Sequence, residues 1–227
     1  MSNKGELLVM EKKIAILTSG GDAPGMNAAI RAAAKAAMAK GMKVYGVQRG
    51  YLGMLNDEIF PMDSGYVSGI IDRGGTRLLT ARCLEFKDPK FRAIAAQNLK
   101  KKRNRRTSSN RWRRFLIVEL TYYHKEHGIK VIGIPGTIDN DIKGTDFTLG
   151  FDTCLNTILD AISKIRDTAT SHERTILVEV MGRHAGDLAL QACIAGGGDG
   201  LLIPEMDNPI ELLAFQIKER RKQGKFT

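Results

Sequence analysis

Two closely spaced aspartates, Asp139 and Asp141, are the residues of this sequence best suited to acid–base chemistry. They belong to the run 135–141 (PGTIDND), which follows an apolar stretch, and open α/β sheets bind ligands where such strands end. Carboxylates placed there could remove a proton from a hydroxyl group and hold a cation. The alternative is a turn in which these side chains form hydrogen bonds to the backbone. The residue types alone do not decide between a chemical role and a structural turn.

A second candidate site is the glycine-rich run 20–25 (GGDAPG), which stands between a predicted strand and a predicted helix. Backbone N–H groups and the positive end of the helix dipole can bind a phosphate at such a junction. Glycines let the backbone approach the anion closely. The same pattern also occurs as a purely structural turn.

Cationic side chains follow further along the chain. Arg166, Arg174 and Arg183, together with His172, are suited to binding phosphate groups. As isolated residues, each would instead be read as a solvated surface charge.

The elements that must position these residues alternate between strands and helices, which predicts α/β architecture with parallel strands. The run 50–53 is predicted to be a turn, and Asp88 is predicted to cap the helix that follows it. Strands are predicted at 12–18, 42–47, 130–134, 175–180 and 201–203, and helices at 26–40, 88–101, 153–165, 185–195 and 209–223.

Composition excludes several classes of protein. The 227 residues are 43% hydrophobic and 26% charged, and no run approaches the roughly 18 apolar residues of a membrane span. The first 13 residues resemble neither a signal peptide nor a transit peptide, so a cytoplasmic location without a membrane partner is expected. Cys83, Cys154 and Cys193 are too far apart to suggest a disulfide framework or a zinc site.

The net charge of +10 comes mainly from one stretch. Residues 100–114 contain nine of the 35 basic residues and no acidic one, so 26 basic residues against 25 acidic ones would remain without it. The stretch also holds the single tryptophan, Trp112. Such a composition raises the possibility of a nucleic-acid-binding arm.

Seven motifs are spread along the chain: ILTSGGDAPGMNAAIR (16–31), GYLG (50–53), RGGT (73–76), PGTIDND (135–141), SHER (171–174), EVMGR (179–183) and AGDL (185–188). Together they resemble the bacterial ATP-dependent 6-phosphofructokinase family, in the same order and at similar spacing. The resemblance implies an α/β fold of two domains with parallel sheets flanked by helices, incomplete at the C-terminus. It assigns 1–150 to a nucleotide-binding domain and 151–227 to part of a sugar-phosphate-binding domain.

The same resemblance implies a glycolytic kinase that transfers the γ-phosphoryl group of ATP to the 1-hydroxyl of fructose 6-phosphate, giving fructose 1,6-bisphosphate. Asp139 matches the catalytic base and Thr137 its partner at the transferring phosphate; both also belong to the substrate site. Gly136 resembles the ATP-using branch of the family, because the diphosphate-using branch has a lysine there. ATP and Mg²⁺ are the implied cofactors, and a homotetramer is the implied assembly.

Further site residues are likewise carried over from the family. Arg174 matches an arginine that reaches the substrate from a neighbouring subunit. The remaining matches are Gly21, Arg82 and Cys83 in the ATP site, Met181, Gly182 and Arg183 in the sugar-phosphate site, and Arg31, Lys35 and Arg166 in an allosteric effector site.

The basic stretch departs from the family, which has a strand and a GGDGS loop between the positions of Leu99 and Lys125. That loop holds ATP and carries the Mg²⁺-binding aspartate, so no metal ligand is assigned in this chain. With suitable codons for Arg103–Phe115, the bases read one position later spell GIDELVVIGGDGS, the missing strand and loop. We therefore interpret about 103–124 as a frameshifted segment, through a gene lesion or a sequencing error, rather than as a nucleic-acid arm. Its six arginines between 103 and 114 are also expected to exclude it from a buried central strand.

Two further departures bear on function. Family members continue well beyond the position of Thr227, which predicts a fragment, and the alternative function is a catalytically inactive sugar-phosphate-binding fragment or pseudogene product. A basic nucleic-acid-binding module is the remaining alternative. The family also often has an effector-binding arginine near Ser64, and its absence here leaves allosteric control open.

Overall fold

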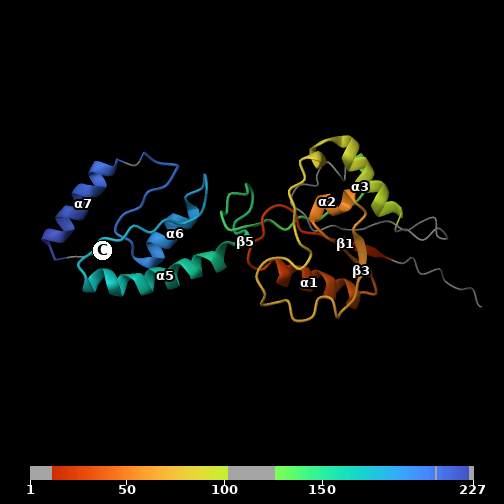
Figure 1. The fold of residues 1–227 in the computed structure, drawn as a ribbon, viewed down its shortest axis with the longest axis horizontal. Coiled ribbons are helices and arrows are strands. Elements are labelled where there is room, and N and C mark those ends of the chain that lie inside the picture. Colours follow the sequence, from red (N-terminus) through yellow and green to blue (C-terminus); the bar gives the residue numbers. More distant parts are fainter. Residues whose placement is uncertain (1–11, 102–125, 208, 225–227) are drawn as a thin grey trace, which may run out of the picture. The chain divides into compact units, whose positions relative to one another are not determined.

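The computed structural model describes residues 12–101, 126–207 and 209–224 (Figure 1). The predictions for the segment around 103–124 therefore lie outside the described residues. The chain divides into two compact units, Met1–Ile134 and Pro135–Thr227, which are treated separately below. The family-based domain border near Gly150 stays a prediction.

The first unit is built on a three-stranded sheet in the order β1-β2-β3. β1 (Lys13–Ile16) and β2 (Lys43–Val47) are parallel, and they confirm the strands predicted at 12–18 and 42–47. β3 (Ile59–Met62) pairs antiparallel with β2 and was not predicted. The first unit is α/β as expected, and its sheet has an antiparallel strand at one edge.

Two helices of the first unit, α1 and α3, begin where the sequence predicts. α1 starts directly after Gly25, and the side chain of Asp88 accepts a hydrogen bond from the N–H of Lys90 at 2.8 Å, as a capping residue does. The prediction of a turn at 50–53 is wrong. That run opens a short helix because Tyr51 and Met54 bury their side chains, and the Tyr51 ring stacks on Phe86 at 4.0 Å. The helical elements are α1 (Met26–Ala39), α2 (Gly50–Leu55), η1 (Glu85–Lys87) and α3 (Pro89–Lys101).

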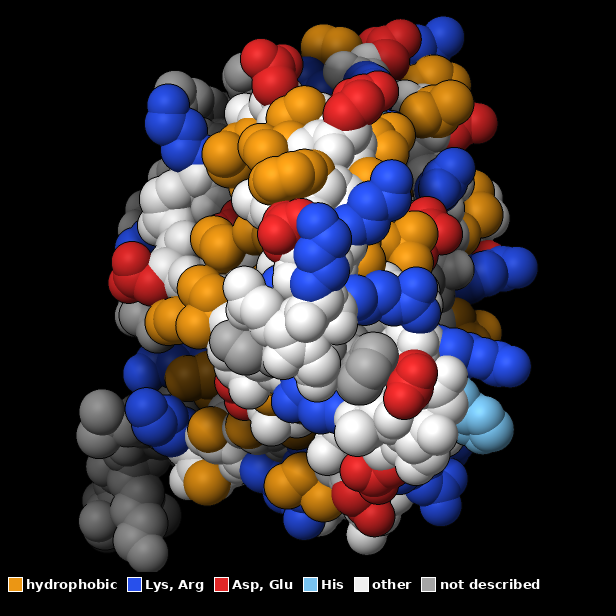
Figure 2. Space-filling view, turned by 90° about the vertical axis from the view of Figure 1, so that its left-hand side faces the viewer, with side chains coloured by type: hydrophobic (Ala, Val, Ile, Leu, Met, Phe, Trp, Pro, Cys, Tyr) orange, Lys and Arg blue, Asp and Glu red, His pale blue; other side chains and the backbone are white. Residues whose placement is uncertain are grey.

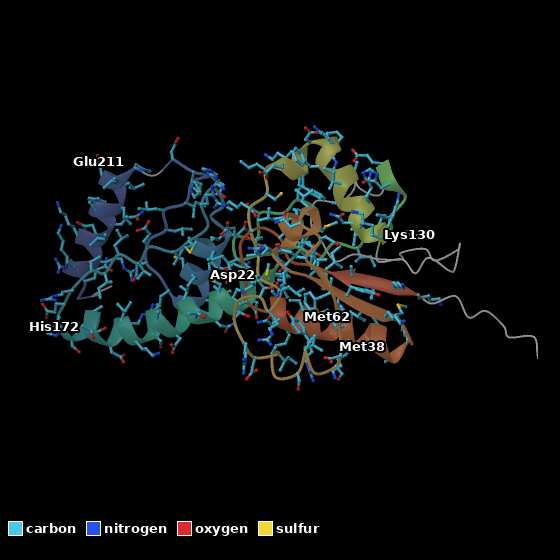
Figure 3. The ribbon with its side chains drawn as sticks, turned by 45° about the vertical axis from the view of Figure 1, so that its right-hand side comes forward. Asp22, Met38, Met62, Lys130, His172 and Glu211 are labelled. Atoms are coloured by element: carbon cyan, nitrogen blue, oxygen red, sulfur yellow. The ribbon has the colours of Figure 1, made fainter. Side chains whose placement is uncertain are left out.

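Two hydrophobic clusters form the core of this unit, one on each face of β1. Ala15 and Leu17 belong to the cluster that contains residues of α2 and α3, whereas Ile16 belongs to the cluster that contains residues of α1. This alternation follows the two-residue period of a strand. Figure 3 shows Met38 and Met62 on the side of the sheet that faces α1, where Met62 belongs to the second cluster and Met38 packs against it. The glycine-rich loop thus leaves a strand that is buried on both faces.

The second unit consists of a two-stranded parallel pair and three helices. α5 and α6 pack against each other, and they confirm the helices predicted at 153–165 and 185–195, as α7 confirms that at 209–223. Among the described residues, no helix is both long and apolar enough to cross a membrane. The elements are β4 (Gly136–Thr137), β5 (Leu149–Gly150), α5 (Phe151–Ser171), α6 (Asp187–Gly196) and α7 (Ile210–Lys222).

Among the described residues, no strand element is assigned at 130–134, 175–180 or 201–203, although Ile132 forms a single β-bridge. A strand needs a hydrogen-bonded neighbour, and none of the described strand elements pairs along these runs. Val131 packs against the first core cluster, whereas Leu177 is 82% exposed. The last two runs, with α5, α6 and α7, line a largely apolar cavity of about 510 Å³.

Candidate functional site

The glycine-rich run 20–25 connects β1 to α1. Gly20 and Gly25 have φ values of 92° and 87°, in the left-handed region that glycine adopts without strain. Gly25 is the N-cap of α1, so the unpaired N–H groups of the first helical turn open onto this loop. Asp22, labelled in Figure 3, and Gly21 are exposed within it. The loop therefore presents backbone donors to solvent, as a phosphate site requires.

Hydroxyl groups tie the segment 73–80 to this loop. Thr18 Oγ1 lies 2.8 Å from Thr76 Oγ1 and donates to the carbonyl of Leu79 at 3.0 Å. Thr80 Oγ1 donates to the carbonyl of Gly20 at 2.7 Å. These hydrogen bonds fix the segment 73–80 beside the glycine-rich loop and the end of the strand that precedes it.

The side chain of Asn27 makes the most extensive of these ties. Its Nδ2 donates to the carbonyls of Arg73 at 3.0 Å and Gly74 at 3.2 Å, and its Oδ1 accepts from the N–H of Arg77 at 2.6 Å. Sequence reasoning treated this asparagine only as part of a motif. A signal was present, because a polar residue between the buried positions Met26 and Ile30 of an apolar helix face needs internal partners.

The predicted ATP-site residues Gly21, Arg82 and Cys83 lie in this part of the first unit. The bond from Thr80 to Gly20 brings the start of the 80–83 segment beside the residue that precedes Gly21. Arg82 is exposed, whereas Cys83 is half-buried and packs against the first core cluster. Burial raises the pKa of the Cys83 thiol, which keeps it protonated at neutral pH.

The run 135–141 contains β4 (Gly136–Thr137) and the loop that follows this strand in the second unit. The N–H of Asp139 donates to Thr137 Oγ1 at 3.1 Å, which fixes the two predicted catalytic residues relative to each other. Burial raises the pKa of the Cys154 thiol, and the charge of Asp139 raises it further. Thr137 pairs with Gly150, the N-cap of α5, so the loop that carries Asp139 leaves β4 near the beginning of this helix, where helix N–H groups favour an anion.

Asn140 and Thr148 hold this loop in shape, and sequence reasoning gave neither residue a role. Asn140 adopts a left-handed φ of 56°, which asparagine tolerates better than most residues. Its Oδ1 accepts from the N–H of Thr148 at 2.9 Å, and Thr148 Oγ1 donates to the carbonyl of Thr137 at 2.6 Å. Thr148 is 4% exposed, so these bonds are shielded from water.

The residues carried over for sugar-phosphate binding are also in the second unit, and most are exposed. Met181 is 72% exposed, and the side chains of Arg174 and Arg183 are open to solvent. Gly182 is buried with φ 148°, and a Cβ there would lie 2.4 Å from the carbonyl oxygen of Ala185. The turn therefore requires glycine between the two exposed neighbours. Figure 2, viewed from the end where α7 lies, shows Lys and Arg side chains spread over this face with hydrophobic ones between them.

The residues matched to an effector site make hydrogen bonds within their own units. Arg31 Nη1 donates to the carbonyl of Val67 at 2.6 Å, and Lys35 donates to the hydroxyl of Ser64. Arg166 Nη2 donates to the carbonyl of Gly197 at 2.9 Å. Ser64, where the family often has an arginine, thus has an internal lysine partner.

Metal-binding side chains do not gather in the described residues. No group of three His, Cys, Asp or Glu residues there could hold a metal ion. Asp141 is exposed. Mg²⁺ in phosphoryl-transfer sites is usually held by one or two carboxylates together with substrate phosphates, so this finding concerns only a three-ligand cage formed by protein side chains.

Comparison with known proteins shows the relationship of the whole chain. Residues 13–106 and 114–227 match the family model described as Phosphofructokinase. The unmatched residues 107–113 fall inside the segment 103–124 that the sequence singles out.

The chain is similar to curated ATP-dependent 6-phosphofructokinases of bacteria. It is 74% identical over 224 residues to that of Fusobacterium nucleatum, covering 95% of this chain and 67% of the relative. It is 53% identical over 221 residues to that of Macrococcus caseolyticus, covering 94% of this chain and 66% of the relative. The chain thus spans about two thirds of the length of these relatives.

Solved structures agree in fold. Phosphofructokinase from Saccharomyces cerevisiae matches with a TM-score of 0.81 at 33% identity, covering 94% of this chain and 32% of that one. A pyrophosphate-dependent phosphofructokinase from Marinobacter aquaeolei matches with a TM-score of 0.73 at 20% identity, covering 94% and 58%. The second likeness bears on fold alone.

Proposed function

Because the chain belongs to the phosphofructokinase family, we propose that it carries the nucleotide-binding and catalytic loops of an ATP-dependent 6-phosphofructokinase. The reaction transfers the γ-phosphoryl group of ATP to the 1-hydroxyl of fructose 6-phosphate and yields ADP and fructose 1,6-bisphosphate. The observation that carries this proposal is the Asp139 loop, with Asp139 bonded to Thr137 and the loop closed by Asn140 and Thr148. The ATP-dependent relatives support ATP over diphosphate as donor, as does Gly136 at the position of the family's diphosphate-specific lysine.

In this proposal, Asp139 is the base. Its carboxylate takes the proton of the 1-hydroxyl as the oxygen forms a bond to the γ-phosphorus and the bond from that phosphorus to ADP breaks. Thr137 contributes in two ways: its Oγ1 holds the backbone of Asp139, and the hydroxyl faces the transferring phosphoryl group. Orientation of the hydroxyl against the phosphoryl group supplies much of the rate enhancement in such transfers.

The other binding functions are assigned by residue. The loop 20–25, with Gly21, Arg82 and Cys83, binds ATP through backbone N–H groups and positive charge. Arg174, Met181, Gly182 and Arg183 bind the sugar phosphate, with Arg174 acting on a neighbouring subunit of a homotetramer. Arg31, Lys35 and Arg166 bind an effector. The reaction takes place in the cytoplasm, and neither nucleic acid nor membrane is a partner.

Mg²⁺ is the family's metal, and it neutralises phosphate charge during phosphoryl transfer. The described residues contain no group of three His, Cys, Asp or Glu side chains that could hold a metal ion, and Mg²⁺ in such sites is ordinarily completed by phosphates of the substrate. No step above depends on the metal.

The test is a coupled assay that follows ADP formation dependent on fructose 6-phosphate. It is applied to the 227-residue chain and to a full-length version in which GIDELVVIGGDGS replaces residues 103–115, the reading frame of 116–124 is also restored, and the remaining third of the relatives' length is supplied. We expect turnover with ATP in the second protein. Turnover with diphosphate but not ATP, or with neither, would contradict the proposal.

A second candidate function is a non-catalytic sugar-phosphate-binding fragment. The interruption of the family match at 107–113 favours it for the 227-residue chain. Binding of fructose 6-phosphate without turnover would distinguish this fragment from the enzyme, and binding of DNA at low salt would indicate the nucleic-acid alternative.

A further inference from the structure

We propose that Asn27 is a positioning residue that joins the glycine-rich loop 20–25 and the segment 73–80 into one rigid phosphate-binding surface, and so sets the affinity for ATP. The inference rests on the proposed function, because it takes ATP as the ligand of this surface. It assigns a role to a residue that neither the sequence motif nor the catalytic loop explains.

The burial and bonding of Asn27 carry the inference. Its side chain is 4% exposed and uses both ends of the amide: Nδ2 bonds two carbonyls, of Arg73 and Gly74, and Oδ1 bonds the N–H of Arg77. These partners are 46 to 50 residues away in sequence. One side chain thus fixes the backbone of a distant turn.

Packing alone does not account for an asparagine at this position. Asn27 lies in the first turn of α1, next to buried Met26, on a helix whose other buried residues are apolar. Burial of an amide is unfavourable unless its donors and acceptors are satisfied. Asn27 is therefore explained by its hydrogen bonds to the backbone of residues 73–77 and not by packing in the hydrophobic core.

Other contacts place the 73–80 segment against the part of the loop that would meet phosphate. Thr80 bonds the carbonyl of Gly20, and Asp22 Oδ2 lies 3.9 Å from where a Cβ of Gly75 would be. The exposed cation Arg73 lies on the segment itself. Donors that are fixed in advance bind an anion more tightly than mobile ones, so loosening this tie should weaken binding.

Asn98 supplies a matched control in the same unit. It is 5% exposed, and its Nδ2 also donates to two backbone carbonyls, of Met54 and Leu55, both at 3.0 Å. Those carbonyls end α2 and have no part in the ATP surface. Asn27→Ala and Asn98→Ala thus each remove an amide that donates to two backbone carbonyls from a similar depth, although Asn98 Oδ1 accepts from Lys101 Nζ and not from a backbone N–H.

The experiment measures ATP affinity by calorimetry, and thermal unfolding, for the frame-restored, full-length protein and for both alanine variants made in it. We expect both variants to lower the Tm, with Asn27→Ala raising the Kd for ATP about tenfold or more and Asn98→Ala changing it by less than about twofold. Equal changes of Kd in the two variants would overturn the proposal, because the effect would then be general destabilisation.

A milder pair of variants guards against misfolding of Asn27→Ala. Thr80→Val removes the bond to Gly20 from a half-buried side chain, and Thr157→Val removes a comparable bond to the carbonyl of Thr153 on exposed α5. We expect Thr80→Val to raise the Kd for ATP and Thr157→Val to leave it unchanged. No difference between these two would overturn the proposal.

Hydrogen exchange separates failure of the tie from failure of the proposed function. If the unmodified frame-restored protein does not bind ATP, the proposed function fails at this loop, and amide exchange in the 227-residue chain then judges the hydrogen bonds of Asn27 alone. Faster exchange at residues 73–80 in Asn27→Ala than in Asn98→Ala supports the tie. Equal exchange in this segment overturns it.

Discussion

At the scale of single residues, the loop around Asp139, the proposed catalytic base, illustrates how polar side chains can fix a backbone. Thr137, Asn140 and Thr148 use their side chains to hold the loop around Asp139. The carboxylate itself is left partly exposed at the beginning of α5. A base held in this way has a defined position and still has access to a substrate hydroxyl.

The first prediction concerns this carboxylate in the frame-restored, full-length enzyme. Asp139→Asn should lower kcat by about 10²- to 10⁴-fold, the contribution of a positioned base, with little change in the KM for fructose 6-phosphate. Binding should persist because it depends on cations such as Arg174 and Arg183. Steady-state kinetics check this, with Asp146→Asn, an exposed carboxylate in the same loop, as the control. An Asp139→Asn enzyme with near-normal kcat would remove Asp139 from the role of base.

A second residue-scale prediction concerns pH. Burial is the main cause that lowers the pKa of His127; the carboxylate of Glu126 opposes it, and the charges of Lys100 and Arg92 add to it. The folded state therefore binds a proton less readily than the unfolded chain, whose histidine pKa is about 6.5. The contribution of neutral His127 to the free energy of unfolding is therefore complete above the unfolded pKa. It is lost as the pH falls through the lower pKa of the folded state.

Urea unfolding at pH 8, 6.5 and 5 measures this dependence. His127→Gln should lose less unfolding free energy on acidification than the unmodified chain, because glutamine does not titrate. Identical losses in the two proteins would show that other groups cause the acid sensitivity.

At the scale of elements, α2 shows how close packing can reverse a local preference. Gly53 lies inside this helix, where alanine is ordinarily more favourable by about 1 kcal/mol. A Cβ at Gly53, however, would lie 1.7 Å from the carbonyl oxygen of Gln48. The glycine therefore serves a close backbone approach and not flexibility.

The third prediction follows from that distance. Gly53→Ala should destabilise the chain by about 1–3 kcal/mol, the usual cost of overpacking, instead of stabilising it. Gly74→Ala is the control, since a Cβ there meets no atom within 4 Å. Denaturant unfolding compares the two, and a Gly53→Ala protein as stable as the parent would mean that α2 shifts freely away from Gln48.

At the scale of the whole molecule, the two units differ in how their strands are paired. The first unit has a three-stranded sheet covered by two hydrophobic clusters. In the second unit, the apolar runs 175–180 and 201–203 line a cavity instead of pairing with a described strand. An α/β core with unpaired apolar runs is expected to have low stability and to self-associate.

The fourth prediction concerns the activity of the 227-residue chain. The 227-residue protein should have negligible phosphofructokinase activity, because the family's ATP- and Mg²⁺-binding loop is replaced by an arginine-rich sequence at 103–115. Resequencing of the gene across these codons and the coupled kinase assay check this together. Turnover by the purified 227-residue chain at rates typical of the family would contradict it.

Sequence and tertiary structure contributed different parts of this picture. The motifs around Gly20–Gly25 and Pro135–Asp141, and the periodicity of the helices, were sufficient to predict the family, the α/β class and the positions of α1, α3, α5, α6 and α7. These features are local, since a loop motif or a helix is recognised from residues close together in the chain.

The partners of each segment were decided only in three dimensions. Strands were predicted from apolar composition at 130–134 and 175–180, yet a strand forms only where a distant segment supplies its hydrogen bonds, and none of the described strands does so there. The ties from Asn27 to the 73–77 turn and from Thr148 to Thr137 were equally hidden. They join side chains to backbone groups that no short-range pattern places together, so only tertiary structure could bring them into contact.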